Sequence, residues 1–221
     1  GLQCMTPLAS SADLQGKRIR TAGAYWARWA ESMGATPVSM SINETLEGLN
    51  QGVLDCTASN TADFVNFGFI DVVKHFYIGA PGAQFVAPMT INKDSWNALS
   101  DDNKAAMLRA HAELSANMTW VYIEEGRSGK ERAPGLDIEY VDAPAEIIEK
   151  NRAFIAEDQK AVAAIFEERV GIANGEAAAA ELTSLLEKWT ALTKDLASAE
   201  ELGKVLYDEV YSKIDVSSYG S

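Results

Sequence analysis

The pattern of apolar residues changes near Ser100, and this change limits the folds that the chain can adopt. Before Ser100, short segments rich in β-branched and aromatic residues alternate with short helical patterns, which is typical of an α/β fold. After it, long helical patterns over 101–125, 144–170 and 175–194 predominate, with one more strand near 136–141. The sequence therefore predicts an α/β region followed by an excess of helix.

Several short strands and helices are expected in the first 92 residues. Gly16, Gly34 and Gly52 lie next to such segments, as glycines do at turns and helix ends. Because strands that alternate with helices normally form a parallel sheet, we expect a parallel sheet covered by helices. The expected elements are strands over 17–21, 36–40, 53–56, 71–79 and 83–92 and helices over 24–33, 44–51 and 59–69, with Asn43 as the N-cap of the second helix.

A long helix is expected to begin at Ser100. Asp101 and Asp102 follow this serine, and acidic residues are favourable in a first helical turn. We expect the helix to reach Glu125 or slightly beyond, and the segment "GRSGKE" at 126–131 to be a polar break. The helix should pack through one apolar stripe that recurs at intervals of four and three residues, made of Met107, His111, Leu114, Met118 and Val121.

The charge of the chain excludes two classes of partner. It has 19 basic and 32 acidic residues, which gives a net charge of -13. Such an acidic surface repels nucleic acid and anionic lipid, so neither is an expected partner. An anionic small molecule remains possible, because one desolvated arginine can dominate the electrostatic field inside a pocket.

The motifs of common catalytic and cofactor sites are absent from the sequence. It contains no G-x-S-x-G or H-E-x-x-H motif, and "GRSGKE" lacks the spacing of a phosphate-binding loop. His75 and His111 are best interpreted as core or interface histidines. No metal, cofactor or catalytic residue is therefore expected. The rival interpretation is an enzyme that uses Asp55 or Asp63 as general base.

The two cysteines leave the compartment open. Cys4 and Cys56 fit neither a Cys-x-x-C redox motif nor a zinc-ligand cluster. Whether they form a disulfide cannot be decided from their spacing.

Polar and aromatic residues gather where the early strands end. In open α/β sheets, ligands bind beyond the carboxyl ends of the strands. Arg20 is the last or next-to-last residue of its strand, and its guanidinium can donate two parallel hydrogen bonds to a carboxylate. The alternative is that Arg20 pairs with a structural acid and that Trp26 fills the core. The expected ligand-binding residues are Arg20, Tyr25, Trp26, Ser59, Asn60 and Phe64.

Four sequence blocks in a fixed order resemble a known family. They are "DLQGKRIRT", "MGATPVSMS", "GLNQGVLD" and "INKDSWNALS", and the first three surround the Arg20 region. Together they resemble the substrate-binding proteins of tripartite ATP-independent periplasmic (TRAP) transporters, which include binders of C4-dicarboxylates and sialic acid. With the helical tail, the resemblance covers essentially the whole chain.

The resemblance implies a binding protein and not an enzyme. It implies a two-lobed α/β fold that closes on its ligand by hinge motion, with Arg20 in a bidentate salt bridge to the ligand's carboxylate. Ser59 falls where the sialic acid binders have a ligand-contacting amide, Asn60 replaces their proline, and Ile42 replaces their phenylalanine. These departures argue against sialic acid as the ligand. Tyr25 and Trp26 suggest instead an aromatic wall for a bulkier or partly apolar organic acid.

The resemblance also implies a division of the chain, a location and partners. We expect the second-lobe ligand-binding part at 1–84, a strand and a long helix that cross toward the first lobe at 85–130, and a return strand with C-terminal helices at 131–221. The chain thus resembles a C-terminal fragment that lacks most of the first lobe. The expected location is the periplasm, and the expected partners are a small organic acid and the TRAP membrane permease. A ligand-sensing module of the same fold is the alternative.

Overall fold

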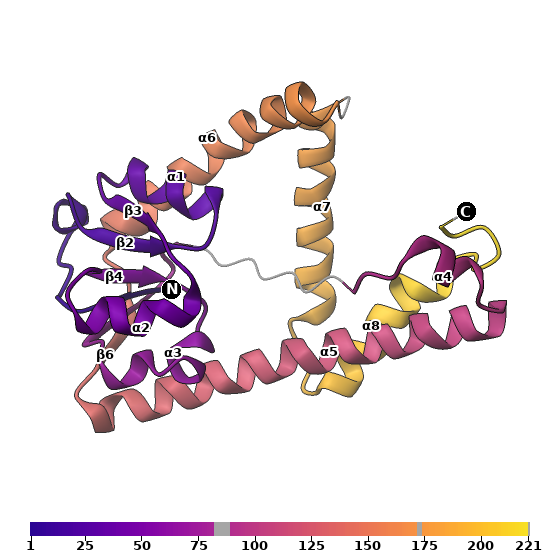
Figure 1. Ribbon diagram of the computed structural model, residues 1–221, viewed down its shortest axis with the longest axis horizontal. Coiled ribbons are helices and arrows are strands. Elements are labelled where there is room, and N and C mark those ends of the chain that lie inside the picture. Colours follow the sequence, from indigo (N-terminus) through magenta and orange to yellow (C-terminus); the bar gives the residue numbers. More distant parts are fainter. Residues whose placement is uncertain (82–88, 172–173, 221) are drawn as a thin grey trace. The chain divides into compact units, whose positions relative to one another are not determined.

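The computed structural model describes residues 1–81, 89–171 and 174–220 (Figure 1). The chain forms two compact units. The first contains Gly1–Gln84 and Glu124–Ala180, and the second contains Phe85–Ile123 and Glu181–Ser221. The boundaries between the units cut two helices, α5 (Asp101–Arg132) and α7 (Gly175–Thr193). The expected three-part division of the chain stays a prediction.

The first unit is built on a six-stranded sheet with the strand order β3-β2-β4-β1-β5-β6 (Figure 1). All neighbouring strands are parallel except β1, which is antiparallel to both β4 and β5. The α/β fold is therefore confirmed, but the sheet is mixed and not wholly parallel. The strands are β1 (Leu2–Cys4), β2 (Arg18–Thr21), β3 (Thr36–Ser39), β4 (Cys56–Ala58), β5 (His75–Ile78) and β6 (Glu139–Asp142).

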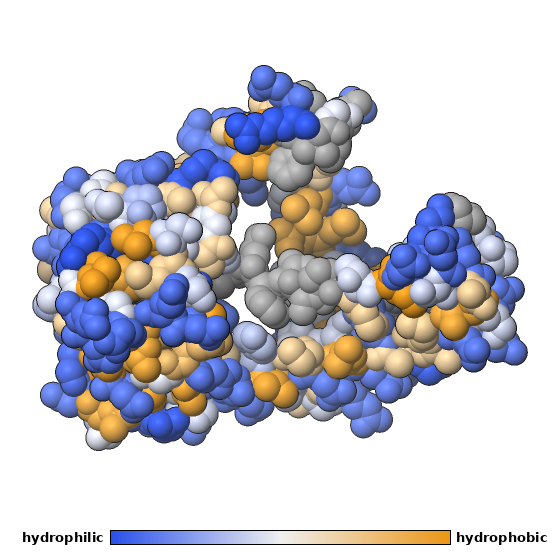
Figure 2. Space-filling view, in the orientation of Figure 1, coloured by the Kyte–Doolittle hydropathy of each residue, from blue (hydrophilic) through white to orange (hydrophobic). Residues whose placement is uncertain are grey.

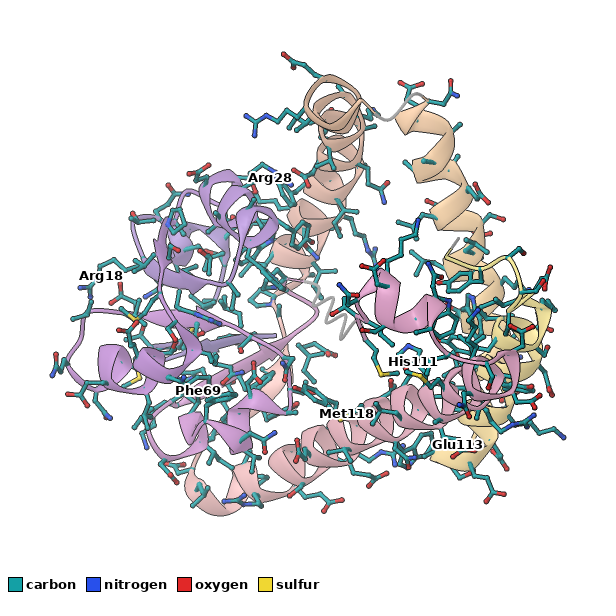
Figure 3. All side chains as sticks on the ribbon, turned by 45° about the vertical axis from the view of Figure 1, so that its right-hand side comes forward. Arg18, Arg28, Phe69, His111, Glu113 and Met118 are labelled. Carbon is teal, nitrogen blue, oxygen red and sulfur yellow. A yellow bond between two sulfur atoms is a disulfide. The ribbon has the colours of Figure 1, made fainter. Side chains whose placement is uncertain are left out.

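One face of the sheet packs against α1 (Ala24–Ser32) and α6 (Ala145–Val170). Ile19 in β2 and Trp29 in α1 are fully buried in this cluster, and Ile147 of α6 joins them. An ion pair between Arg28 and Asp158 links α1 to α6, with 2.5 Å between Nε and Oδ1. Figure 3 labels Arg28 on its helix. Apolar packing and this ion pair therefore fix both helices to the first face.

The opposite face is covered by α2 (Ile42–Asn50), α3 (Asp63–Asn66) and the short 3-10 helix η2 (Phe69–Asp71). The last turns of α5 also reach this face. A Cβ added at Gly126 would lie 2.5 Å from Thr61 Oγ1, and one at Gly129 would lie 2.9 Å from a ring carbon of Phe64. The expected polar break at 126–131 is thus wrong, because its glycines let α5 pass close to α3 as a continuous helix.

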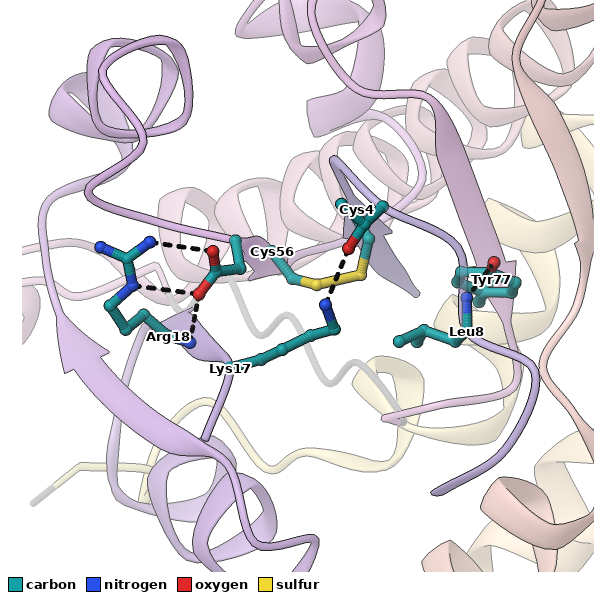
Figure 4. The surroundings of a disulfide bond; sticks show 8 residues. Cys4, Leu8, Lys17, Arg18, Cys56 and Tyr77 are labelled. Carbon is teal, nitrogen blue, oxygen red and sulfur yellow. Dashed lines mark hydrogen bonds and ion pairs between the residues drawn. A yellow bond between two sulfur atoms is a disulfide. The ribbon is translucent and has the colours of Figure 1, made fainter. Parts of the chain in front are cut away.

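A disulfide between Cys4 and Cys56 joins β1 to β4 in the middle of the sheet (Figure 4). Both cysteines are fully buried in the first-face cluster, and their Cα atoms are 4.1 Å apart. The pairing that the spacing left open is therefore present. It fixes β1, a strand of only three residues, to the parallel part of the sheet.

The second unit is helical in its described part. It contains α4 (Lys93–Asn97), parts of α5 and α7, α8 (Ala199–Glu209) and the 3-10 helix η4 (Tyr211–Lys213). Gly203 of α8 packs against Ala112 and Ala116 of α5, so small residues allow the two helices a close approach. Of the described helices, none is both long and apolar enough to cross a membrane.

The apolar stripe expected for α5 is wrong for its second half. Leu114, Met118 and Val121 are 50%, 41% and 49% exposed. Figure 3 labels Met118, and Figure 2 shows apolar side chains on the surface along α5. The buried residues are instead Leu108, Ala112 and Ala116, because the small residues of α8 pack against that side of the helix.

Three local predictions in the first unit are also corrected. Ser41 and not Asn43 caps α2, since the Ser41 side chain accepts a hydrogen bond from the Asn43 backbone. The strand expected at 53–56 begins only at Cys56, because the backbone N–H groups of 53 and 54 bond to the Gly48 carbonyl. The third helix is divided into α3 and η2 at Gly68, which has a φ of 71°.

The other expected helices and the strands at 17–21, 36–40, 71–79 and 136–141 are confirmed within a few residues. Strand β1 was not expected. The strand expected at 83–92 falls mostly outside the described residues, and its described part, 89–92, contains no strand.

Removal of the disulfide should destabilise the chain. We expect Cys4→Ala with Cys56→Ala to lower the free energy of unfolding by about 2 to 4 kcal/mol, because the bond closes a loop between positions 52 residues apart. Urea unfolding followed by circular dichroism measures this change. As a control, dithiothreitol should lower the unfolding midpoint of the parent chain and leave the double variant unchanged. An equal midpoint for parent and variant would contradict the structural role of the bond.

Candidate functional site

A row of neighbouring residues crosses the sheet on its second face. Residues opposite one another in adjacent strands point their side chains to the same face. The residues at both ends of the row are apolar and belong to the cluster under α2 and α3. The middle of the row is polar, with one residue each from β2, β4 and β1. In strand order it consists of Val38, Arg20, Thr57, Gln3, Phe76 and Tyr140.

Arg20 is the charged residue of this row. It is only 6% exposed, and its Nε donates a hydrogen bond of 3.0 Å to the Met40 carbonyl. It forms no ion pair with any residue that the structure describes. Burial lowers the pKa of Arg20, and the negative charge of Asp63 opposes part of this shift. The guanidinium is therefore a desolvated cation that lacks a carboxylate partner within the described chain.

Arg18, two residues earlier in the same strand, shows the opposite arrangement (Figure 4). Its Nε and terminal nitrogen donate to the two carboxylate oxygens of Asp55 at 3.0 and 2.9 Å. The Asp55 carboxylate also accepts the Arg18 backbone N–H at 2.8 Å. Arg18 is thus paired with a structural acid. The sequence left open that Arg20 pairs with a structural acid too, but no described acid forms an ion pair with it.

The segment after β4 places further polar groups near this row. Ser59 is buried, and its hydroxyl donates a hydrogen bond to Oδ2 of Asp63. Asn60 is half-buried, and its Oδ1 accepts the backbone N–H of Asp63 at 2.8 Å. Arg20 lies opposite Thr57 in the register of β2 and β4. Ser59 follows Thr57 by two residues. The fold therefore brings Arg20, Ser59 and Asn60 to one part of the sheet.

Gln3 and Thr57 belong to the same group but were not among the expected site residues. Both are fully buried, and Gln3 Oε1 and Thr57 Oγ1 have no hydrogen-bond partner among the described residues. The Gln3 side-chain nitrogen donates to the Asn60 carbonyl at 3.1 Å. Thr57 could have been found from the sequence, because it is a polar residue in a short, otherwise apolar strand. Gln3 gave no such signal because β1 was not recognised.

Of the aromatic residues expected in the site, Phe64 lies beside the apolar end of the row, whereas Tyr25 and Trp26 lie with the first-face cluster. Phe64 is fully buried in the second-face cluster, where its ring contacts Phe76 and Tyr140. Trp26 is half-buried and packs against the first-face cluster. Tyr25 contacts Trp26 and Phe154, and burial raises the pKa of its hydroxyl. Direct contact of these three rings with a ligand stays a prediction.

The rival catalytic interpretation loses one of its two candidate bases. The hydrogen bond from the Arg18 side chain lowers the pKa of Asp55, so its carboxylate is a weaker base than an ordinary aspartate. Asp63 accepts a hydrogen bond from Ser59 and faces the positive field of Arg20.

The second unit contains a groove of its own, between α5 and α8. Its volume is about 490 Å³, and charges of both signs line it, including Arg109, Glu113 and Lys204. Arg109 donates to the Tyr207 hydroxyl at 2.9 Å and lies over its ring. Because the groove is open and its charges are mixed, it lacks the buried, single-sign field that favours capture of a small anion.

Comparison with known families decides the class of the chain. The model of the family described as bacterial extracellular solute-binding protein, family 7, matches residues 3–169. The chain belongs to this family. Residues 3–169 contain the whole Arg20 row, so the polar group described above lies within the family 7 match.

Solved structures agree with the family 7 fold. A TRAP periplasmic solute-binding protein from Bordetella bronchiseptica with bound (R)- and (S)-mandelate is 22% identical, with a TM-score of 0.68, over 85% of this chain and 60% of that one. A marine metagenome TRAP protein specific for pyroglutamate is 22% identical, with a TM-score of 0.64, over 81% and 57%. One from Desulfovibrio salexigens with bound orotic acid is 17% identical, with a TM-score of 0.65, over 86% and 58%.

These comparisons confirm the family resemblance and the fold class drawn from the sequence. Members of family 7 are described as solute-binding proteins, which agrees with the interpretation as a binder and not an enzyme. The chain spans about 60% of the length of the Bordetella protein.

The difference between the two arginines of β2 can be tested by stability. We expect Arg20→Met to raise the free energy of unfolding of the ligand-free chain by about 1 kcal/mol, because it removes an unpaired buried charge. The matched variant Arg18→Met should lower it only slightly, since the pair with Asp55 is partly exposed. Urea unfolding at pH 7 compares the two. An equal loss of stability in both variants would show that Arg20 is already paired.

Proposed function

We propose that this chain is the Arg20-bearing part of a periplasmic solute-binding protein that captures a small organic acid and delivers it to a TRAP permease. The observation that carries the proposal is the buried guanidinium of Arg20, which has no ion-pair partner among the described residues. A buried charge without a partner costs free energy, so a site that keeps one is suited to a ligand of opposite charge. The carboxylate of the ligand supplies that charge when it binds.

One salt bridge does not account for useful affinity. A hydrogen-bonded contact to a charged group contributes about 1.5 to 3 kcal/mol, whereas a micromolar dissociation constant corresponds to about 8 kcal/mol. Ser59 and Asn60 supply further polar contacts in this proposal, and Gln3 and Thr57 each add a buried polar atom that no described residue satisfies. Apolar contacts from Tyr25 or Trp26 and from the part of the relatives that this chain does not span provide the rest.

The ligands of related structures support the class of compound. The Bordetella protein carries mandelate, the metagenome protein pyroglutamate and the Desulfovibrio protein orotic acid. All three compounds are carboxylic acids with a ring. This agrees with an arginine as the anchor of the carboxylate.

Two observations support the periplasm as the location. The family is described as extracellular, and structural disulfides such as Cys4–Cys56 persist in oxidising compartments. Delivery to a membrane permease follows from the TRAP proteins that the chain resembles. The long helix α5, which belongs in part to each unit, is the element expected to take part in closure around the ligand.

The proposal predicts that Arg20 dominates binding. We expect Arg20→Ala to weaken binding of the best acid by about a hundredfold, roughly 3 kcal/mol, because a bidentate charged contact is lost. The matched control is Arg18→Ala, which should change affinity less than about twofold because Arg18 is engaged by Asp55. Isothermal titration calorimetry against a panel of small carboxylates measures both. Retention of affinity by Arg20→Ala would remove Arg20 as the anchor.

A further inference from the structure

Asp63 is a second buried charged group near Arg20, and the proposed anchoring of a carboxylate does not explain it. It is 8% exposed and is the first residue of α3. Its negative charge acts on the Arg20 guanidinium, but the two side chains do not form an ion pair. The charges therefore interact without direct contact.

The carboxylate of Asp63 is only partly used by the protein. The Ser59 hydroxyl donates to Oδ2, whereas no described residue donates a hydrogen bond to Oδ1. The charge of Asp63 is thus left to the Ser59 hydroxyl and to the field of Arg20.

Two further polar atoms in the row receive no hydrogen bond from a described residue. Gln3 Oε1 is a hydrogen-bond acceptor, and Thr57 Oγ1 can accept or donate. Both are completely buried and without partners among the described residues, which costs free energy unless a water or a ligand satisfies them. With Asp63, they place an excess of acceptors beside one cationic donor.

We propose that Asp63 selects acids that carry a hydroxyl or N–H group next to the carboxylate. This inference rests on the proposed function, because the carboxylate must first be held by Arg20. In the proposed arrangement, Arg20 holds the carboxylate and the adjacent hydroxyl or N–H group donates to Oδ1 of Asp63, to which no described residue donates. An acid without this donor leaves Oδ1 of Asp63 without a hydrogen bond from the ligand.

Matched pairs of acids test the inference. Each pair differs only in the donor: lactate and propionate, mandelate and phenylacetate, and pyroglutamate and 3-oxocyclopentanecarboxylate. All are ionised at pH 7.5, so Arg20 sees the same charge in each. We expect the chain to bind the donor-bearing member of its best pair at least tenfold more tightly, as befits a hydrogen bond to a charged acceptor.

The variant Asp63→Asn then assigns the preference to one residue. It keeps an oxygen for the Ser59 hydroxyl but presents an N–H group to the ligand, so we expect the preference to fall below threefold. The matched control is Asp55→Asn at the other end of β4, which should leave the preference unchanged because Asp55 serves Arg18. Calorimetry or competitive NMR titration gives the ratios, and circular dichroism checks that each variant is folded.

The possible results separate the two proposals. If the parent chain binds acids through Arg20 but does not distinguish the members of any pair, the inference about Asp63 is overturned and the proposed function stands. Persistence of the preference in Asp63→Asn also overturns it. If none of the acids binds, the proposed function fails and the inference with it. Should Asp63→Asn not fold, the pairwise ratios of the parent chain alone decide.

Discussion

The buried charge of Arg20 is the constraint on which the rest of the site depends. A guanidinium taken out of water needs an anion or a full set of acceptors, and the described protein supplies one carbonyl and the charge of Asp63 without an ion pair. Arg18 shows that the same strand can pair an arginine with a carboxylate of the protein, that of Asp55. The contrast between the two residues separates a structural ion pair from a buried charge that is left for the proposed ligand.

The position of Arg20 follows from the alternation of side chains along a strand, which point to opposite faces of the sheet in turn. Ile19 faces the α1 and α6 side, so Arg20 faces the side of α2 and α3, where its neighbours across the strands are Thr57 and then Gln3. Strand β1 inserts antiparallel into the sheet and is tied to β4 by the disulfide, which holds Gln3 in the row. The pair of strands β1 and β4 therefore contributes both to the stability of the fold and to the geometry of the candidate site.

Much of the fold could be predicted from the sequence, because short strands and turn glycines are local signals, and the motif around Arg20 drew attention to a residue that proves to be buried. Gln3 could not, because a strand of three residues is defined by its partners β4 and β5 and not by its own composition. Asp63 was predictable only as a possible base, since the break of the third helix at Gly68 depends on tertiary packing. The apolar stripe of α5 was mispredicted because Ala112 and Ala116, and not the larger apolar residues, contact α8.

The most direct measurement is a crystal structure of the chain with a bound organic acid, either carried through purification or added from the panel that calorimetry selects. The account predicts both carboxylate oxygens of the ligand within about 3 Å of the Arg20 guanidinium nitrogens. A ligand carboxylate held elsewhere, for example in the groove beside Arg109, or an Arg20 side chain paired with a carboxylate of the protein, would contradict it.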